Sequence, residues 1–236
     1  MAYNVQAANT VFEYIARKIK TRQWEPGTKI ETEEQLCRQL NVSRIAVRQA
    51  IEKLSAVSVL RKVQGSGTYV EQFENTSLLG LPFYAAGDDV MITILEFRRM
   101  FDSYNAELFI GKCTDEEIAL LEKNYEEMKK SVDDKEKFHS CDNAFHEIIA
   151  KGTRNVIIMQ ISNLFTGLFA EHQMFLYDNV GPESGIYYHG MILDAIKSRN
   201  AELASIYSRM SIDCSIKALM EKAGMKPSDV KGSAAN

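Results

Sequence analysis

The chain has 236 residues, of which 45% are hydrophobic and 25% are charged, a composition typical of a soluble protein that forms a core. No run approaches the roughly 18 apolar residues that a membrane span needs, and the first residues lack the basic flank and apolar stretch of a signal peptide. The four cysteines form no Cys-x-x-Cys pair, which argues against a zinc knuckle or a disulfide framework. We therefore expect a cytoplasmic protein of two domains.

The net charge of −4 is unevenly distributed along the chain. Residues 1–75 hold 11 Lys and Arg against 8 Asp and Glu, a net charge of +3, and the remainder holds 17 against 24, a net charge of −7. Such asymmetry indicates a basic module that can approach phosphates, joined to an acidic body with another task.

Three helices are predicted at the start of the chain. Apolar residues recur at three-to-four spacing over 11–19, and Thr32-Glu33-Glu34-Gln35 fits a capping box that begins a second, short helix. The pair Asn41-Val42 makes a tight turn, and Ser43 caps a third helix. Two short helices joined by a tight turn predict a helix-turn-helix.

The third helix begins with Ser43, Arg44 and Ile45, and Arg48 follows one turn later. In a helix-turn-helix, the N-terminal residues of the second helix of the motif contact base edges in the major groove. Arg44 and Arg48 lie four apart and share one stripe, where each guanidinium can bind guanine or a phosphate with two hydrogen bonds. We predict that these four residues contact DNA.

A β-hairpin is predicted after the third helix. Residues 57–63 and 68–70 alternate as strands, and Gly65 and Gly67 lie in the turn between them. Glycines there allow positive φ and let backbone amides approach a phosphate. Arg61 and Lys62 can add phosphate contacts, so we predict a wing that contacts DNA.

Residues 8–72, including the segment PGTKIETEEQLCRQLNVSRIAVRQAIEKL, resemble the DNA-binding domain of the GntR family of bacterial regulators. The resemblance implies a winged helix that binds a short palindrome as a dimer, with contacts from Arg44, Arg48, Gly65 and Gly67. The chain departs from the family at Glu34, where an arginine is often found. A carboxylate there would repel phosphate and change the operator preference.

Residues 75–89 show no sustained period and predict a linker between a winged helix over 1–74 and a second domain over 90–224, with a flexible tail over 225–236. The rest of the chain is helical in pattern and predicts an all-α bundle. The expected helices cover 90–112, 115–131, 134–151, 155–177, 185–198 and 201–223. The predicted fold class is therefore mainly α.

Asp142 and His146 lie four apart on one face of a predicted helix, and His189 lies in a later one. A carboxylate and two imidazoles that converge inside a bundle suit zinc, nickel or manganese. The alternative is an ordinary polar contact or surface pair.

Residues 90–222 resemble the FCD ligand-binding domain of the FadR-like branch of the GntR family. The resemblance implies that Asp142, His146 and His189 bind a metal, and that Arg98 meets a carboxylate of the effector. The family's fourth ligand would fall at Ser211, a poor ligand, so that water would complete the shell or His139 or His172 would substitute. Alternatives are a salt bridge from Arg98 to Asp102 or Glu96, and a metal-free pocket for a larger apolar effector such as an acyl-CoA.

The sequence thus predicts a ligand-responsive transcription regulator, a repressor that binds a palindromic operator as a homodimer through contacts between the bundles. The expected partners are operator DNA and a small carboxylate effector, and no enzymatic activity is expected. Two other classes are a metal-dependent hydrolase that uses the same three ligands and an architectural DNA-binding protein that senses no ligand.

Overall fold

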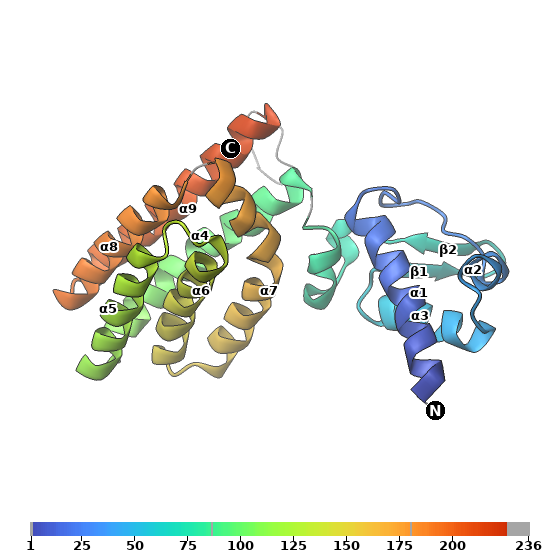
Figure 1. Cartoon of the computed structure of the whole chain (residues 1–236), viewed down its shortest axis with the longest axis horizontal. Helices are drawn as coiled ribbons and strands as arrows, with labels where there is room; N and C mark the ends of the chain where they lie inside the picture. The colour runs from blue at the N-terminus through green and yellow to red at the C-terminus, as the bar shows by residue number, and fades with distance from the viewer. Residues whose placement is uncertain (1, 86, 180, 226–236) are drawn as a thin grey trace. The chain divides into compact units, whose positions relative to one another are not determined.

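The computed structural model describes residues 2–85, 87–179 and 181–225. The chain divides into two compact units, residues 1–90 and 91–236 (Figure 1). None of the helices in the described ranges is long and apolar enough to cross a membrane.

The first unit is a winged helix-turn-helix, as the sequence predicts. Its elements are α1 (Ala2–Lys20), α2 (Glu33–Leu40), α3 (Arg44–Ala56), β1 (Leu60–Val63) and β2 (Gly67–Val70), and α3 packs against α1, α2 and β1. Thr32 begins α2 with the predicted capping box, in which its side chain accepts from the Gln35 amide. Asn41, at φ 52°, turns the chain sharply before Ser43 caps α3. These local signals fix the angle at which α3 leaves α2.

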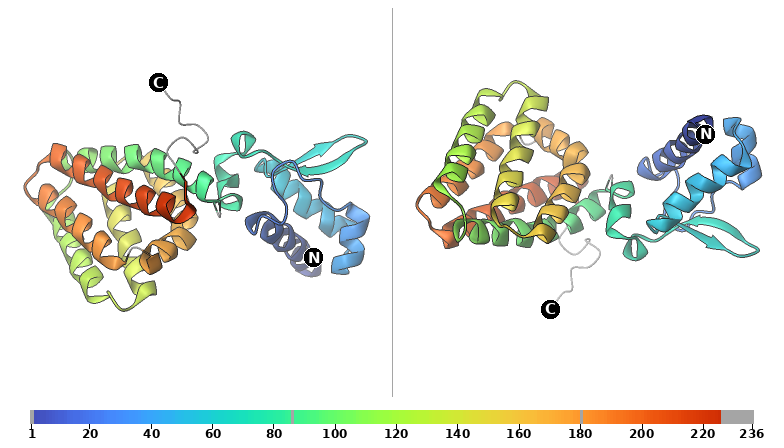
Figure 2. Two further views of the ribbon diagram at one scale, coloured as in Figure 1. Left: turned by 90° about the horizontal axis from the view of Figure 1, so that it is seen from above. Right: turned by 90° about the horizontal axis from the view of Figure 1, so that it is seen from below.

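The wing is the antiparallel pair β1–β2, in which Leu60 pairs with Val70 and Val63 with Gly67. The hairpin projects beyond the helices of its own unit (Figure 2). Gly65 and Gly67 have φ values of 73° and 143°, which an L side chain rarely adopts. A bridge between Lys29 and Tyr69 ties the preceding segment to the hairpin.

The segment 75–89, for which we predict a linker, carries the 3-10 helix η2 (Leu78–Phe83), after a first short one, η1 (Phe73–Asn75). The Tyr84 hydroxyl donates to the Glu71 carbonyl at 3.0 Å, and the buried Phe83 ring meets Phe12 edge-on at 5.8 Å between centroids. The segment therefore packs onto the winged helix, and the first unit extends to Val90.

The second unit is the predicted bundle of six helices. They are α4 (Asp88–Ile110), α5 (Asp115–Lys130), α6 (Lys135–Gly152), α7 (Val156–Asn179), α8 (Pro182–Lys197) and α9 (Ala201–Ala223). The start of α8 lies three residues before the predicted one, because proline suits the first turn of a helix. Helix α6 lies between α5 and α7, while α8 packs against α5 and α9.

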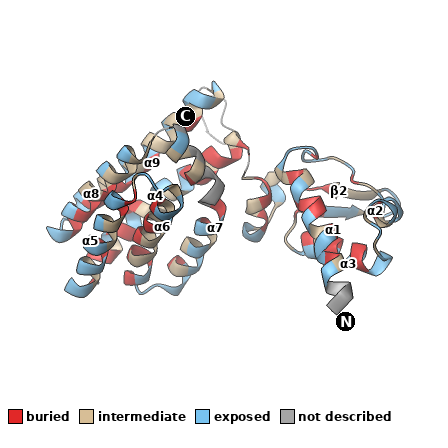
Figure 3. Cartoon of the chain, viewed as in Figure 1, coloured by how far each residue is buried: buried red, intermediate tan, exposed pale blue. Residues whose placement is uncertain are grey.

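Large apolar side chains of α4, α5, α6 and α8 form the centre of the bundle core. Phe109, Phe145, Leu121, Met128 and Ile196 are all less than 2% exposed. Figure 3 shows buried residues on the helix faces that point into the bundle and exposed residues on the outer faces. The core anchors α6 and α8, the two helices that carry the predicted metal ligands.

Gly152, at the end of α6, gives a test of this packing. A Cβ at this position would lie 2.3 Å from two ring carbons of the buried Phe109, so Gly152→Ala is expected to lower the free energy of unfolding by about 1–3 kcal/mol. Gly167 in α7 is the matched control, because its Cβ would meet nothing within 4 Å. Gly167→Ala should raise stability by up to about 1 kcal/mol. Urea unfolding of both variants measures the difference, and equal stabilities would contradict the close contact.

Candidate functional site

The first candidate site is the exposed end of α3. Arg44, Ile45 and Arg48 are all exposed, and the Ile45 side chain is 61% exposed although it is apolar. The Arg48 Nε donates to the Glu33 carboxylate at 2.8 Å, which holds its guanidinium beside the start of α2. Arg44 and Ile45 thus lie at the end of the helix that a helix-turn-helix presents to bases.

Glu34, the departure from the family pattern, forms an ion pair with Arg38 one turn along α2. This pairing offsets part of the negative charge that would otherwise face a phosphate.

In the wing, Arg61 and Lys62 are exposed. The Arg61 guanidinium lies 3.2 Å from the Glu71 carboxylate and 5.6 Å from the centre of the Tyr69 ring. These contacts hold the Arg61 side chain against the hairpin and restrict the orientation of its guanidinium.

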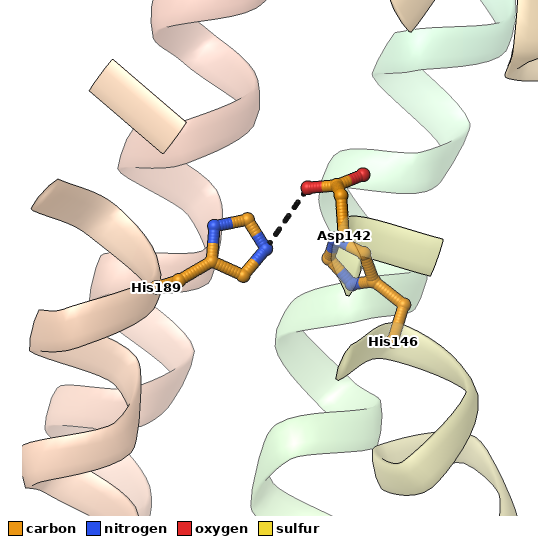
Figure 4. Close-up of side chains that lie close together, drawn as sticks. All are labelled: Asp142, His146 and His189. Carbon is orange, nitrogen blue, oxygen red and sulfur yellow. Dashed lines mark ion pairs between the residues drawn. The ribbon is translucent and has the colours of Figure 1, made fainter. Parts of the chain in front are cut away.

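The second candidate site lies in the bundle, where Asp142 and His146 on α6 meet His189 on α8. One ligand atom from each lies within 4.8 Å of the others. The His189 Nε2 is 3.1 Å from the Asp142 Oδ1. Figure 4 shows His189 reaching from α8 toward Asp142 and His146, which both come from α6. The structure thus brings together the three residues that the sequence predicts.

The hydrogen bonds of His189 determine which of its ring nitrogens is available. Its Nδ1 lies 2.6 Å from the Gly185 carbonyl, and a carbonyl only accepts, so Nδ1 carries the hydrogen. In the neutral ring Nε2 then has a lone pair, which faces the Asp142 carboxylate, and this buried atom has no hydrogen-bond partner among the described residues. A proton on Nε2 or a bound cation satisfies both atoms at this distance, and the three side chains are of the types that bind a metal ion.

The ionisation of the cluster also suits a metal. Burial opposes the charge of Asp142, but the close pairing with His189 and the positive charge of Arg98 hold its pKa well below the usual range. Burial, with Arg98 nearby, lowers the pKa of His146 to about 4. At neutral pH the carboxylate is therefore ionised and His146 is neutral, the forms in which these groups bind metals.

Arg98, on α4, forms the salt bridge to Asp102 that is the alternative to a contact with the effector. Its Nε donates to the Asp102 carboxylate at 2.6 Å, which is the predicted alternative of a salt bridge, and both side chains are less than 15% exposed. Arg98 also lines the cavity beside the metal ligands. The Asp102 carboxylate also lies near the cluster, with its Oδ2 3.8 Å from the His146 Nδ1.

A cavity that opens to solvent lies beside the cluster, with about 720 Å³ of empty space when the solvent at its mouth is included. Its lining includes the three predicted ligands, Arg98, Ser211 on α9 and His139 on α6. Neither Ser211 nor His139 belongs to the ligand cluster, and the side chain of His172 lies outside the described residues. Ser211, where the family's fourth ligand would fall, therefore lies in the wall of the same cavity as the three ligands.

Gln173, on α7, is a member of this site that the sequence analysis missed. Its Nε2 donates to the Asp142 Oδ2 and, at 3.1 Å, to the Asn143 Oδ1. The side chain is only 6% exposed. Because Gln173 holds the Asp142 Oδ2, the other oxygen of this carboxylate, Oδ1, is positioned toward His189.

Comparisons with known proteins match both units. The model of the FCD domain matches residues 93–213, more than half of the chain, and that of the bacterial regulatory proteins of the gntR family matches residues 7–70. The regulator LutR of Bacillus subtilis is 28% identical over 196 residues, which are 79% of this chain and 89% of LutR. The galactonate operon transcriptional repressor of Escherichia coli is 21% identical over 215 residues, with 88% and 94% covered.

Among solved structures, one of a Listeria monocytogenes protein, Lar, described as controlling expression of the agr system, has a TM-score of 0.69 and 17% identity, covering 91% of this chain and 96% of that one. This likeness supports the fold. The chain belongs to the gntR family of bacterial regulatory proteins, and its C-terminal unit is an FCD domain.

Proposed function

We propose that the chain is a repressor that binds a palindromic operator as a homodimer and responds to a small carboxylate held beside a divalent metal. The observation that carries the effector half is the convergence of Asp142, His146 and His189 on a cavity that Arg98 also lines. The name of the galactonate operon repressor supports it, because galactonate is a small carboxylate. The Arg98 guanidinium and the imidazoles in the cavity wall favour such an anion over a long apolar effector.

Asp142, His146 and His189 would hold the metal. A metal bound by three side chains keeps a coordination position open, and it would attract a carboxylate oxygen there. The hydroxyl of Ser211 is too weak a ligand to close that position. Arg98 adds a second positive charge at the cavity wall.

On the DNA side, Arg44 and Arg48 would meet the major groove and the Gly65–Gly67 turn would meet the backbone or the minor groove. Ser43 caps the recognition helix, and Arg61 and Lys62 add charge along the wing. Effector binding in the bundle would change the placement of two winged helices in the dimer and so change operator affinity.

Thermal shift measurements test the sensing role. Zinc, nickel or manganese should raise the melting temperature of metal-stripped protein, and a small carboxylate should raise it further. A panel of metals and carboxylates that leaves the melting temperature unchanged would contradict the proposal and favour a purely architectural DNA-binding protein.

The homodimer has a candidate surface on α4. Phe97, Met100 and Tyr104 follow one another at three-to-four spacing and are 42%, 61% and 58% exposed, so they form an apolar stripe on one face. Phe97 also packs against the buried Phe165 of α7, which anchors one end of the stripe in the bundle. A helix-turn-helix monomer reads one half-site only, and we propose that a second copy covers this stripe.

Met100→Glu is expected to shift the protein from dimer to monomer at micromolar concentration, because it places an unpaired charge in the interface. Sedimentation velocity measures the change. Tyr187→Glu on α8 is the control, since Tyr187 is also apolar and 60% exposed but lies outside the stripe. If both variants remain dimeric, another surface forms the dimer.

A further inference from the structure

A short segment that precedes α2 extends the sheet of the wing. Lys29 forms an antiparallel bridge with Tyr69, and a backbone hydrogen bond on each side of the bridge joins residues 28–30 to β2. Residues directly opposite each other in antiparallel strands point to the same face of a sheet. Arg61 also pairs with Tyr69, so Arg61, Tyr69 and Lys29 form one row across the wing. The next residue, Ile30, is buried, which places this outer row on the opposite, exposed face.

Gly67 leaves room for the Lys29 side chain to reach the turn of the wing. Gly67 precedes Tyr69 by two residues on β2, so it lies on the same face as the outer row and nearer the turn. A Cβ at Gly67 would lie 2.7 Å from the Lys29 Cε and 3.4 Å from its Nζ. The Lys29 side chain therefore runs across Gly67, and its ammonium lies beside the turn.

The two cations of the outer row differ in their pairing. The Arg61 guanidinium lies 3.2 Å from the Glu71 carboxylate, which offsets its charge. Lys29 is exposed, and its ammonium has no ion pair within the part of the chain that the structure describes. A lysine ammonium is a compact charge with three donor hydrogens, which suits it to a phosphate oxygen. Lys29 is thus the cation of this row that is available to an anion.

We propose that Lys29 binds a phosphate of the DNA backbone beside the Gly65–Gly67 turn, so that the outer row of the wing is part of the DNA interface. This inference rests on the proposed function, in which the turn meets DNA. Gly67 then has two roles, because it adopts a φ of 143° and leaves the space that Lys29 crosses. A phosphate contact positions the protein on the duplex and reads no sequence, so Lys29 strengthens binding to any DNA.

The test is the salt dependence of DNA binding by the full chain, measured by fluorescence anisotropy with its own upstream DNA and with random DNA of equal length. Lys29→Gln removes the charge and should lower the slope of log K against log salt by about one for each chain bound. At about 100 mM salt the affinity should fall about three- to tenfold for each chain bound, equally on both DNAs. Lys29→Arg keeps the charge and should bind like the wild type. Lys53→Gln removes the same charge near the far end of α3 and should also bind like the wild type.

The outcomes separate this inference from the proposed function. If the wild type binds neither DNA, operator binding fails and the inference fails with it. If the wild type binds with a steep salt slope that Lys29→Gln retains, the inference is overturned while the proposed function stands. An equal loss in Lys53→Gln would assign the effect to net charge and overturn the contact. A loss confined to the upstream DNA would make Lys29 a base contact and overturn the phosphate contact.

Discussion

Replacement of His189 by alanine is expected to lower the affinity for a divalent metal by at least about 100-fold. Loss of a group that only orients a ligand typically costs about 10–100-fold, and loss of the ligand itself should cost more. His189 is buried, and the Gly185 carbonyl fixes its ring so that Nε2 faces Asp142. Among the described residues the ligand cluster holds only three members, and Ser211 in the cavity wall is a poor ligand, so the loss of one nitrogen removes a third of the protein ligands.

Competition between the protein and a chromophoric chelator for zinc measures this effect. The control is His139→Ala, because His139 lines the same cavity but lies outside the ligand cluster. Zinc affinity in this control should stay within about threefold of wild type, which is a small free-energy difference. Tight binding of one zinc ion by His189→Ala, or equal losses in both variants, would contradict the assigned ligands.

The second large effect is expected at the DNA surface, where Arg44→Ala should cost about 1–3 kcal/mol of binding free energy on the operator. Arg44 is exposed in the first turn of α3, where a bidentate contact with guanine discriminates between base pairs. The loss should be confined to operator DNA. Fluorescence anisotropy with the DNA upstream of the chain's own gene and with random DNA of equal length measures both affinities.

Lys53→Ala is the control for charge, because Lys53 is exposed near the far end of the same helix. Its operator affinity should equal that of the wild type. A comparable loss on random DNA in Arg44→Ala would make Arg44 a phosphate contact, and no loss on either DNA would remove it from the interface.

The helices could be predicted from the sequence because their signals are local. Thr32 and Ser43 both cap the helices that their positions predict. The packing of residues 75–89 could not be predicted in this way. It depends on Tyr84 reaching the carbonyls of Val59 and Glu71, groups distant in sequence, and 3-10 turns leave no sustained period.

The residues of the site could be predicted where their chemical type is typical of a metal ligand. Asp142 and His146 share a helix face by spacing alone, whereas the sequence offers His189 as a third imidazole on a later helix without showing that the two helices bring it close. Gln173 was missed because a glutamine gives no metal signal, and because α7 is rich in apolar residues around its circumference, so its cavity-facing side cannot be read from the pattern. The two expectations for Arg98 are compatible, since one guanidinium has five donor hydrogens.

The central claim is that a ligand in the bundle controls DNA binding, and an operator titration tests it most directly. Full-length protein is titrated onto its upstream DNA at fixed salt, first stripped of metal, then with zinc, and then with zinc and each carboxylate of the panel. We predict that at least one carboxylate changes the dissociation constant about tenfold or more in the presence of zinc, a typical allosteric coupling, and that His189→Ala abolishes the change. Salt-sensitive operator binding that is identical under every condition would contradict the account.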